Sequence, residues 1–208
     1  MAHLQQIGVD VRTNARVECV DPAGVIVNGQ RIGSRTVLWS AGVVASPAGK
    51  WLGAETDRLG RVKVNADLSV PGRSSVFVIG DTAFVVAPSR TLFGFRKEAQ
   101  PLPGVAQPAI QEGKYVAGVI RRRISGQPPP PPFWYWDKGN LAIVGRTFAV
   151  ADLPSFRFSG VLAWLLWLGI HIYFLIGFAN RLLVMLQWGI SFWTKRRGVR
   201  IFPLKRQG

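Results

Sequence analysis

Hydrophobic and polar residues alternate along the first part of the chain, and this pattern predicts short β-strands. Three segments show the alternation: Gly8–Arg12, Arg16–Val20 and Gly24–Val27. Between the second and the third, Asp21-Pro22-Ala23-Gly24 is composed of turn residues, which predicts a tight connection. The chain therefore begins with small β-structure.

A continuous apolar segment follows at Thr36–Gly42. Such a run predicts a buried strand, and the small residues Ala41 and Gly42 at its end would let a dinucleotide approach the backbone. A strand end that is simply tightly packed is the alternative.

A second apolar run, Val76–Ile79, is followed directly by Gly80 and Asp81. Four β-formers in a row predict a buried strand, and ligands of open α/β sheets bind beyond the carboxyl ends of such strands. Gly80 permits close approach of a ligand, and the Asp81 carboxylate can accept hydrogen bonds from sugar or ribitol hydroxyls. An ordinary strand–loop–helix unit, in which Asp81 caps the helix, is the alternative.

The segment after Pro103 predicts a loop that runs into a helix. Pro108 suits a first helical turn, and apolar residues then recur at helical spacing. These residues are Ala109, Ile110, Val116, Ala117 and Ile120. Gln107 and Gln111 are four residues apart and so share one face. A helix N-terminus stabilises negative charge, such as that on a reduced flavin.

The connections are predicted from composition. Residues 87–102 are polar and predict a long loop, and Arg121–Arg123 ends the helix with favourable charge. Pro128–Pro132 predicts a stiff spacer and the clearest domain boundary. Phe133–Gly145 then predicts a β-hairpin whose turn lies near Asp137–Asn140.

Residues 158–180 form a run of 23 residues without Asp, Glu, Lys or Arg. A helix of that length would be about 34 Å long and could cross a bilayer. One crossing would, however, place the basic tail after Arg181 on the outer side, against the positive-inside tendency, and Leu182–Thr194 is too short to return. We therefore expect helices at about 161–180 and 182–194 that lie in one leaflet, and a single transmembrane helix at about 161–180 is the alternative.

Charge supports a membrane surface as partner. The chain has a formal net charge of +15; residues 1–112 contain 12 basic and 9 acidic residues, whereas residues 113–208 contain 14 and 2. The basic half is also rich in tryptophan, which fits anionic lipids better than nucleic acid. We expect Trp164, Trp167, Trp188 and Trp193 at the membrane interface. His171 is expected to be an interfacial or packing residue, and a proton donor to quinone is the alternative.

The single cysteine, Cys19, cannot form an intramolecular disulfide, and we expect a buried, inert thiol. The first residues lack the basic and apolar regions of a secretory signal, so we expect a cytoplasmic location for the catalytic part. No grouping of residues predicts a metal site.

The motifs VFVIGDTA at 76–83 and LPGVAQPAIQEG at 102–113 resemble the C-terminal half of the type II (non-proton-pumping) NADH:quinone oxidoreductases, which are two-dinucleotide-fold flavoproteins. The resemblance extends from about Gly8 to Phe202. It implies that Gly80 and Asp81 hold the flavin, that Ala106 borders its ring, and that Gln107 and Gln111 lie toward the quinone.

The resemblance adds further expectations about the site. The family carries an aromatic-Asp-Lys-Gly segment that matches Trp136–Gly139, and it implies that Lys138 approaches the flavin ring. The implied catalytic residues are Gln107, Gln111 and Lys138. Those implied to bind cofactor are Ala41, Gly42, Gly80, Asp81, Ala106, Gln107 and Lys138.

The implied fold class is α/β, the C-terminal part of a two-dinucleotide-binding-domain flavoprotein, followed by a β-hairpin and membrane-surface helices. Residues 1–46 would end the NADH-binding domain, 47–126 would complete the FAD-binding domain, and 127–208 would hold the hairpin and anchoring helices. The cofactors and substrates are FAD, NADH and a quinone, and the partners are the quinone and anionic membrane lipids, with a homodimer as a further option and no nucleic acid. The implied location is the cytoplasmic face of the membrane.

No two of the 23 glycines are two positions apart, so the chain has no G-x-G-x-x-G motif. The resemblance implies two such motifs, both upstream of Met1, and we therefore expect a C-terminal fragment. The alternative function is a catalytically inert membrane-binding fragment. Sulfide:quinone oxidoreductase, a related enzyme, requires cysteines at the flavin, which a lone Cys19 does not supply.

Overall fold

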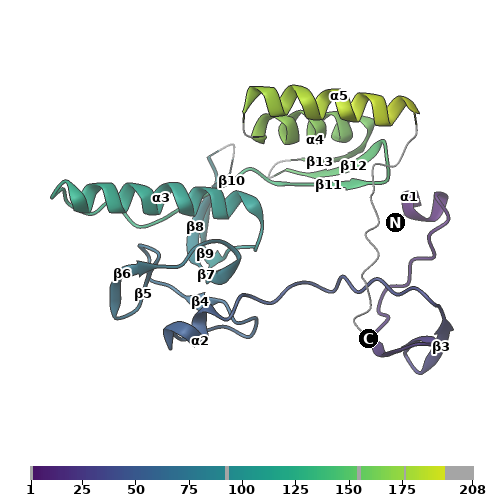
Figure 1. The fold of residues 1–208 in the computed structure, drawn as a ribbon, viewed down its shortest axis with the longest axis horizontal. Helices are drawn as coiled ribbons and strands as arrows, with labels where there is room; N and C mark the ends of the chain where they lie inside the picture. The colour runs from purple at the N-terminus through teal and green to yellow at the C-terminus, as the bar shows by residue number, and fades with distance from the viewer. Residues whose placement is uncertain (1, 92–93, 154–155, 176, 195–208) are drawn as a thin grey trace, which may run out of the picture. The chain divides into compact units, whose positions relative to one another are not determined.

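The computed structural model describes residues 2–91, 94–153, 156–175 and 177–194. It contains two compact units, Met1–Lys138 and Gly139–Gly208. Both combine helices with small sheets, so the fold is of the α/β class (Figure 1). The polyproline segment lies inside the first unit. The boundary between the two compact units, after Lys138, therefore follows the boundary that was expected at this segment.

The first unit begins with helix α1 (Ala2–Gln6) and an antiparallel sheet in the order β1-β2-β3. Its strands are Val17–Asp21, Gly24–Val27 and Gln30–Gly33. The expected turn at Asp21–Gly24 is confirmed, with Asp21 and Gly24 paired across it. Cys19 lies in β1 as expected, but it is exposed, so the expectation of a buried thiol is wrong.

Two expected strands are absent from this part of the described chain. Gly8–Arg12 and Thr36–Gly42 have no regular secondary structure. The side chains of Leu38 and Trp39 are 89% and 66% exposed. An apolar run forms a strand only where a neighbouring strand completes its backbone hydrogen bonds, and no such neighbour pairs with Thr36–Gly42 among the described residues.

The rest of the first unit builds the core around short strand pairs. Its elements are α2 (Ala48–Leu52), β4 (Val62–Lys63), β5 (Ser69–Val70), β6 (Arg73–Phe77), the 3₁₀ turn η1 (Gly80–Thr82), β7 (Ala83–Phe84), β8 (Val86–Thr91), β9 (Arg96–Pro101), α3 (Ala106–Ile124) and β10 (Tyr135–Asp137). Strands β4 and β7 pair in parallel and β5 and β6 antiparallel. The core includes Val62, Leu68 and Val116, and Tyr115 packs edge-on against Phe133 at 5.4 Å between ring centroids.

The segment 87–102 was expected to be a loop, but most of its described residues belong to β8 and β9, which pair antiparallel. Exposed and buried positions alternate along β8, but the buried ones are the small or polar residues Ala87, Ser89 and Thr91. The segment therefore lacked the large apolar residues that mark a strand in a sequence.

The hairpin expected at Phe133–Gly145 is also wrong in its pairing. Strand β10 pairs in parallel with β8, and β11 (Asn140–Val144) pairs with β12 (Phe148–Asp152). The hairpin of the second unit is therefore β11–β12. Gly139, which we expected in a turn, has φ +83° and lies in the short connection between β10 and β11.

The second unit is a three-stranded antiparallel sheet, β11-β12-β13 (Arg157–Gly160), with helix α4 (Val161–Phe174) packed on it and α5 (Phe178–Thr194) packed on α4 (Figure 1). Ala149, Ala151 and Ala163 are fully buried where α4 meets the sheet. Their small side chains let the helix approach closely.

The expected helix over 161–180 ends at Phe174, because Leu175 adopts an extended conformation and donates its backbone N–H to the Ile172 carbonyl. Among the residues described, neither this helix nor any other is both long enough and apolar enough to cross a bilayer. Trp167, His171 and Trp188 form a cluster of nearly parallel rings with centroids 5.0 to 5.7 Å apart, so His171 packs as expected.

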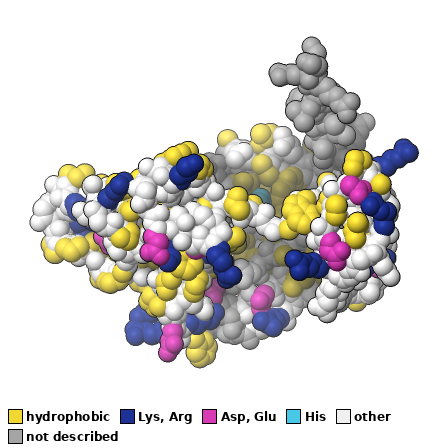
Figure 2. All heavy atoms as spheres, turned by 90° about the horizontal axis from the view of Figure 1, so that it is seen from below, with side chains coloured by type: hydrophobic (Ala, Val, Ile, Leu, Met, Phe, Trp, Pro, Cys, Tyr) yellow, Lys and Arg dark blue, Asp and Glu magenta, His cyan; other side chains and the backbone are white. Residues whose placement is uncertain are grey.

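Apolar side chains remain at the surface of both units. Helix α5 has no buried residue, and its exposed apolar side chains are Phe178, Leu182, Leu183, Met185, Leu186, Ile190, Phe192 and Trp193. Figure 2 shows apolar side chains beside Lys and Arg side chains on one face of the molecule.

Candidate functional site

The Gly80-Asp81 turn follows strand β6 and lies close to helix α3. The strand ends at Phe77, earlier than the expected Ile79, and residues 80–82 form η1. Gly80 has φ +66°, a left-handed conformation that favours glycine, and a Cβ there would lie 3.4 Å from the Ala109 Cβ. Glycine therefore lets the turn approach helix α3 closely.

Helix α3 presents its first turn toward this site. Val105 is its N-cap residue and has an extended backbone, and no side chain caps the helix. Ala106, Gln107 and Pro108 occupy the first turn, as expected for Pro108, whose side chain is buried. The uncapped backbone N–H groups and the helix dipole make this end suited to an anion or an electron-rich ring.

The inner face of α3 differs from the expected one. Pro108, Glu112, Val116 and Val119 are buried, whereas Ile110 and Ile120 are 39% and 43% exposed. The sequence prediction used only apolar residues to place the buried face of α3, and it was wrong because the acidic residue Glu112 belongs to that face.

Glu112 is the residue that the sequence prediction missed. It is 2% exposed, and its Oε2 accepts a hydrogen bond of 2.6 Å from the Gly80 backbone N–H. Burial raises the pKa of the Glu112 carboxyl; the Gly80 bond opposes this shift, and the nearby Asp81 charge adds to it. Its place four residues after Pro108, on the buried face, could have revealed it.

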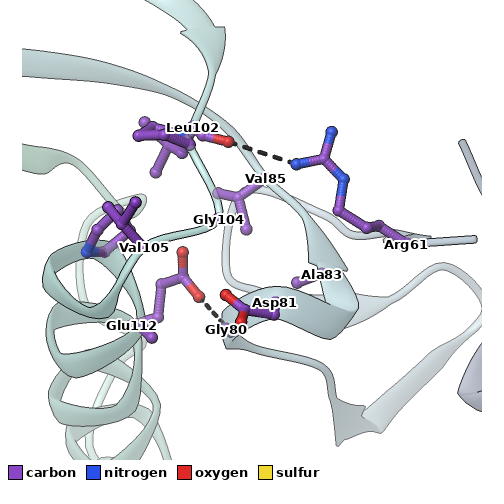
Figure 3. Close-up of a pocket in the computed structure, with 12 residues that line it drawn as sticks. Arg61, Gly80, Asp81, Ala83, Val85, Leu102, Gly104, Val105 and Glu112 are labelled. Carbon is purple, nitrogen blue, oxygen red and sulfur yellow. Dashed lines mark hydrogen bonds between the residues drawn. The ribbon is translucent and has the colours of Figure 1, made fainter. Parts of the chain in front are cut away.

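A small cavity lies between η1 and α3 (Figure 3). It has a volume of about 10 Å³, close to the room that one water molecule needs. Arg61 borders it, pairs with Asp57 at 2.8 Å and lies over the Phe84 ring at 4.9 Å. A cavity this size cannot enclose a flavin, so a flavin would lie against its rim.

Asp81 is exposed at this rim, with Gly104 beside it: a Cβ on Gly104 would lie 3.5 Å from Asp81 Oδ1. Within the described part of the chain, no ion pair or hydrogen bond occupies the Asp81 carboxylate. The carboxylate is therefore available to ligand hydroxyls, and the donor and acceptor groups at this site fit the ribityl part of a flavin.

Gln111 and Lys138 meet at strand β10. Gln111 donates through Nε2 to the Trp136 carbonyl at 3.0 Å and accepts at Oε1 from the Trp136 N–H at 2.9 Å. Lys138 Nζ lies 4.8 Å from the Trp136 ring centroid. Gln111 thus fixes the strand that carries the lysine.

Ala41 and Gly42 lie in the exposed segment 36–46 and not at the end of a strand. Four residues further on, the Ser46 hydroxyl approaches that of Thr82, beside Asp81, at 3.4 Å. The chain that carries Ala41 and Gly42 thus runs toward the Asp81 turn.

Together, a glycine–aspartate turn, a helix N-terminus and paired strands form an arrangement of the kind that α/β nucleotide-binding and flavin-binding proteins use. Two family profiles match the sequence: pyridine nucleotide-disulphide oxidoreductase over residues 1–113 and the NDH2 C-terminal domain over residues 137–197. The chain belongs to the pyridine nucleotide-disulphide oxidoreductase family and, within it, to the type II NADH dehydrogenases.

Individual relatives agree. The type II NADH:quinone oxidoreductase Ndh of Mycobacterium tuberculosis is 42% identical over 95% of this chain, and the probable NADH dehydrogenase of Dictyostelium discoideum is 29% identical over 90%. The chain spans only 42% and 40% of the lengths of these relatives.

A solved structure of NDH2 from Plasmodium falciparum in complex with NADH has a similar fold. Its TM-score is 0.77 at 17% identity, and the alignment covers 96% of this chain and 55% of that one. The α/β fold expected from the sequence is thereby confirmed.

Proposed function

We propose that the chain supplies the flavin-facing and quinone-facing part of an FAD-dependent NADH:quinone oxidoreductase that pumps no protons. The proposal rests chiefly on one observation: an unoccupied Asp81 carboxylate stands beside the uncapped N-terminus of α3. The motifs at this site and the relatives' names support the same assignment. When bound, the flavin would accept a hydride from NADH and pass two electrons to a quinone.

In this proposal each residue has a distinct task. Asp81 accepts hydrogen bonds from the ribityl hydroxyls, Gly80 and Ala106 allow close approach, and the α3 N-terminus stabilises negative charge on the ring. Ala41 and Gly42 are assigned to the cofactor-binding residues because the segment that carries them continues to Ser46. The Ser46 hydroxyl lies 3.4 Å from the hydroxyl of Thr82, the residue after Asp81.

Gln107 and Gln111 are assigned to the quinone side, and Lys138 is assigned to the flavin ring. No hydrogen bond holds the Gln107 amide among the described residues, so it can donate to a quinone carbonyl or the flavin edge. Gln111 acts through Trp136, because its amide is bonded to that backbone. Lys138 supplies positive charge near reduced flavin.

The proposed location is the cytoplasmic face of the membrane, with α4 and α5 at the lipid surface and the basic residues on anionic headgroups. A quinone tail is insoluble in water, so its headgroup must be met where apolar surface is available. The exposed apolar side chains of α5 support this location.

An FAD titration of the purified chain tests the proposal. We expect bound-flavin absorption bands that NADH bleaches, and a loss of affinity of about tenfold or more for Asp81→Asn, because a hydrogen bond to a charged group is lost. Asp10→Asn is the control, since Asp10 pairs only with its neighbour Arg12. If the chain takes up no FAD but still floats with liposomes, the alternative of an inert membrane-binding fragment is correct. The missing G-x-G-x-x-G motif favours that alternative.

A further inference from the structure

The second unit contains a large groove that the proposed redox chemistry does not use. Its volume is about 870 Å³, within the range of roughly 300–1,000 Å³ that is typical of small-molecule sites. Side chains of β11, of the turn after it, and of α4 and α5 line it. All of these residues belong to the unit Gly139–Gly208.

The walls of the groove are apolar and largely aromatic. Trp167 and Trp188 line it with their rings 5.7 Å apart and inclined by only 3°, and Trp164 lies 6.0 Å from Phe192. Leu168 and Met185 add aliphatic surface. Such walls offer dispersion contacts to a hydrocarbon chain and almost no polar partner.

Among the described residues that line the groove, Arg146 is the one that carries a charge. Its Nη2 donates to the Phe192 carbonyl at 2.9 Å, and its guanidinium lies 5.4 Å from the Phe192 ring centroid. These two contacts anchor the guanidinium while most of its five N–H donors remain for a ligand.

No acid of the described chain pairs with Arg146, because the single acid of the second unit, Asp152, is bonded to Arg157 at 2.5 Å. An anchored guanidinium without a carboxylate recognises carboxylate or phosphate in a forked geometry. The groove therefore combines a long apolar slot with one anion-binding point.

This combination fits an amphiphile that has an anionic head and a hydrocarbon chain. An uncharged quinone head could accept a hydrogen bond from Arg146, but only an anionic head also gains the attraction between opposite charges and the forked contact to two oxygens. Phospholipid is the source that the surroundings favour, because the same helices expose apolar side chains such as Leu186 and Ile190, at 57% and 62%, beside the groove.

We propose that this groove is a binding site for one anionic phospholipid, with an acyl chain between α4 and α5 and the phosphate on Arg146. The residues of this site belong to the second unit, whereas Asp81 and the N-terminus of α3 belong to the first, and the proposal does not depend on the redox function. It would give the unit a fixed lipid in addition to any general attraction to a charged membrane.

Two glycines provide a matched pair of variants. Gly189 lines the groove and Gly169 does not, yet both lie inside helices and a Cβ on either would meet no atom within 4 Å. Gly189→Leu therefore adds bulk to the groove with an unobstructed Cβ, and Gly169→Leu adds the same side chain elsewhere. Arg146→Gln and Arg157→Gln likewise remove one charge at the groove and one away from it.

The experiment is native mass spectrometry of the full chain in neutral detergent, titrated with phosphatidylglycerol or with phosphatidylcholine of the same chains. We expect one tightly held phosphatidylglycerol, a loss of affinity of about tenfold for Gly189→Leu and Arg146→Gln, and little change for the two controls. Circular dichroism checks the fold, and Ser191→Leu, which lines the same groove, replaces Gly189→Leu if that variant loses helix.

Equal binding of both lipids, or unchanged binding by Gly189→Leu and Ser191→Leu, would overturn the proposal. So would displacement of phosphatidylglycerol by an equal concentration of oleate or of a long-chain quinone, since either result would assign the groove to another ligand. Because the titration uses no vesicles and no flavin, failure here leaves the proposed function untouched.

Discussion

Gln111 shows how one side chain can connect a helix to a strand. Both polar atoms of its amide are bonded to the backbone of Trp136, at 3.0 and 2.9 Å. Gln107, one turn earlier, has no such bond among the described contacts. Two residues that look equivalent in the sequence therefore have different surroundings.

We predict that Gln111→Ala lowers the free energy of unfolding by about 1–3 kcal/mol, because it leaves two backbone groups of Trp136 without partners. Gln107→Ala should change it by less than about 0.5 kcal/mol. Urea denaturation measures both, and hydrogen exchange at the Trp136 amide should accelerate only in the first variant. Equal effects of the two substitutions would contradict the structure.

Glu112 gives the protein a pH dependence of known sign. Its folded pKa is raised above the reference value of 4.5, mainly by burial. A group of this kind contributes stability below its unfolded pKa, and that contribution is lost as the pH rises through the folded pKa. The Glu112 contribution should therefore weaken between pH 4.5 and the raised folded value.

The variant Glu112→Gln tests this, since the amide oxygen can still accept from Gly80 but does not ionise. We expect the stability of wild type relative to the variant to fall as the pH rises from 4 toward 7, over roughly the window set by the raised pKa. Urea denaturation at several pH values gives the difference. A difference that is constant with pH would show that Glu112 is not buried as described.

At the scale of elements, close packing of α4 on β12 depends on alanine. Ala163 of α4 is fully buried with Ala149 and Ala151 of the strand. Replacing Ala163 by Leu should destabilise the protein by about 1–3 kcal/mol through overpacking. Leu162→Ala, at a position that is 73% exposed, should be nearly neutral. Thermal unfolding followed by tryptophan fluorescence compares them, and equal midpoints would contradict the packing.

Sequence patterns predicted those elements whose information is local. The first turn of α3 around Pro108 and the tight turn between Asp21 and Gly24 follow from residues close together in the sequence. The β8–β9 pair and the parallel partner of β10 were not predictable in this way, because pairing depends on residues far apart in sequence. Small buried residues such as Ala87 and Ser89 also give no hydrophobic pattern.

In the candidate site, too, the features that depend on local sequence were predictable and those that depend on tertiary contacts were not. The motif around Asp81 and Gln107 located the turn and the helix end, and the structure brings them together at one cavity rim. The bond of Glu112 to the Gly80 N–H and the bonds of Gln111 to Trp136 join residues far apart in the sequence, so no local pattern reports them.

At the scale of the whole molecule, the net charge of +15 and the exposed apolar helices predict a specific salt response. We expect the chain to float with liposomes that contain anionic lipid, to bind less as salt rises, and to retain part of its binding at high salt. A nucleic-acid binder would lose nearly all affinity with salt. Flotation across a salt series, with and without competing DNA, separates the two, and complete release by DNA would contradict a lipid surface.

Cys19 is exposed in strand β1, and this affects how measurements of the oligomeric state of this protein must be interpreted. As the chain's one thiol, it can link two copies through an intermolecular disulfide when the sample oxidises in air. A dimer seen without reductant would therefore say nothing about a shared interface until dithiothreitol or Cys19→Ser has been tried. The same thiol offers a single attachment point for a maleimide dye.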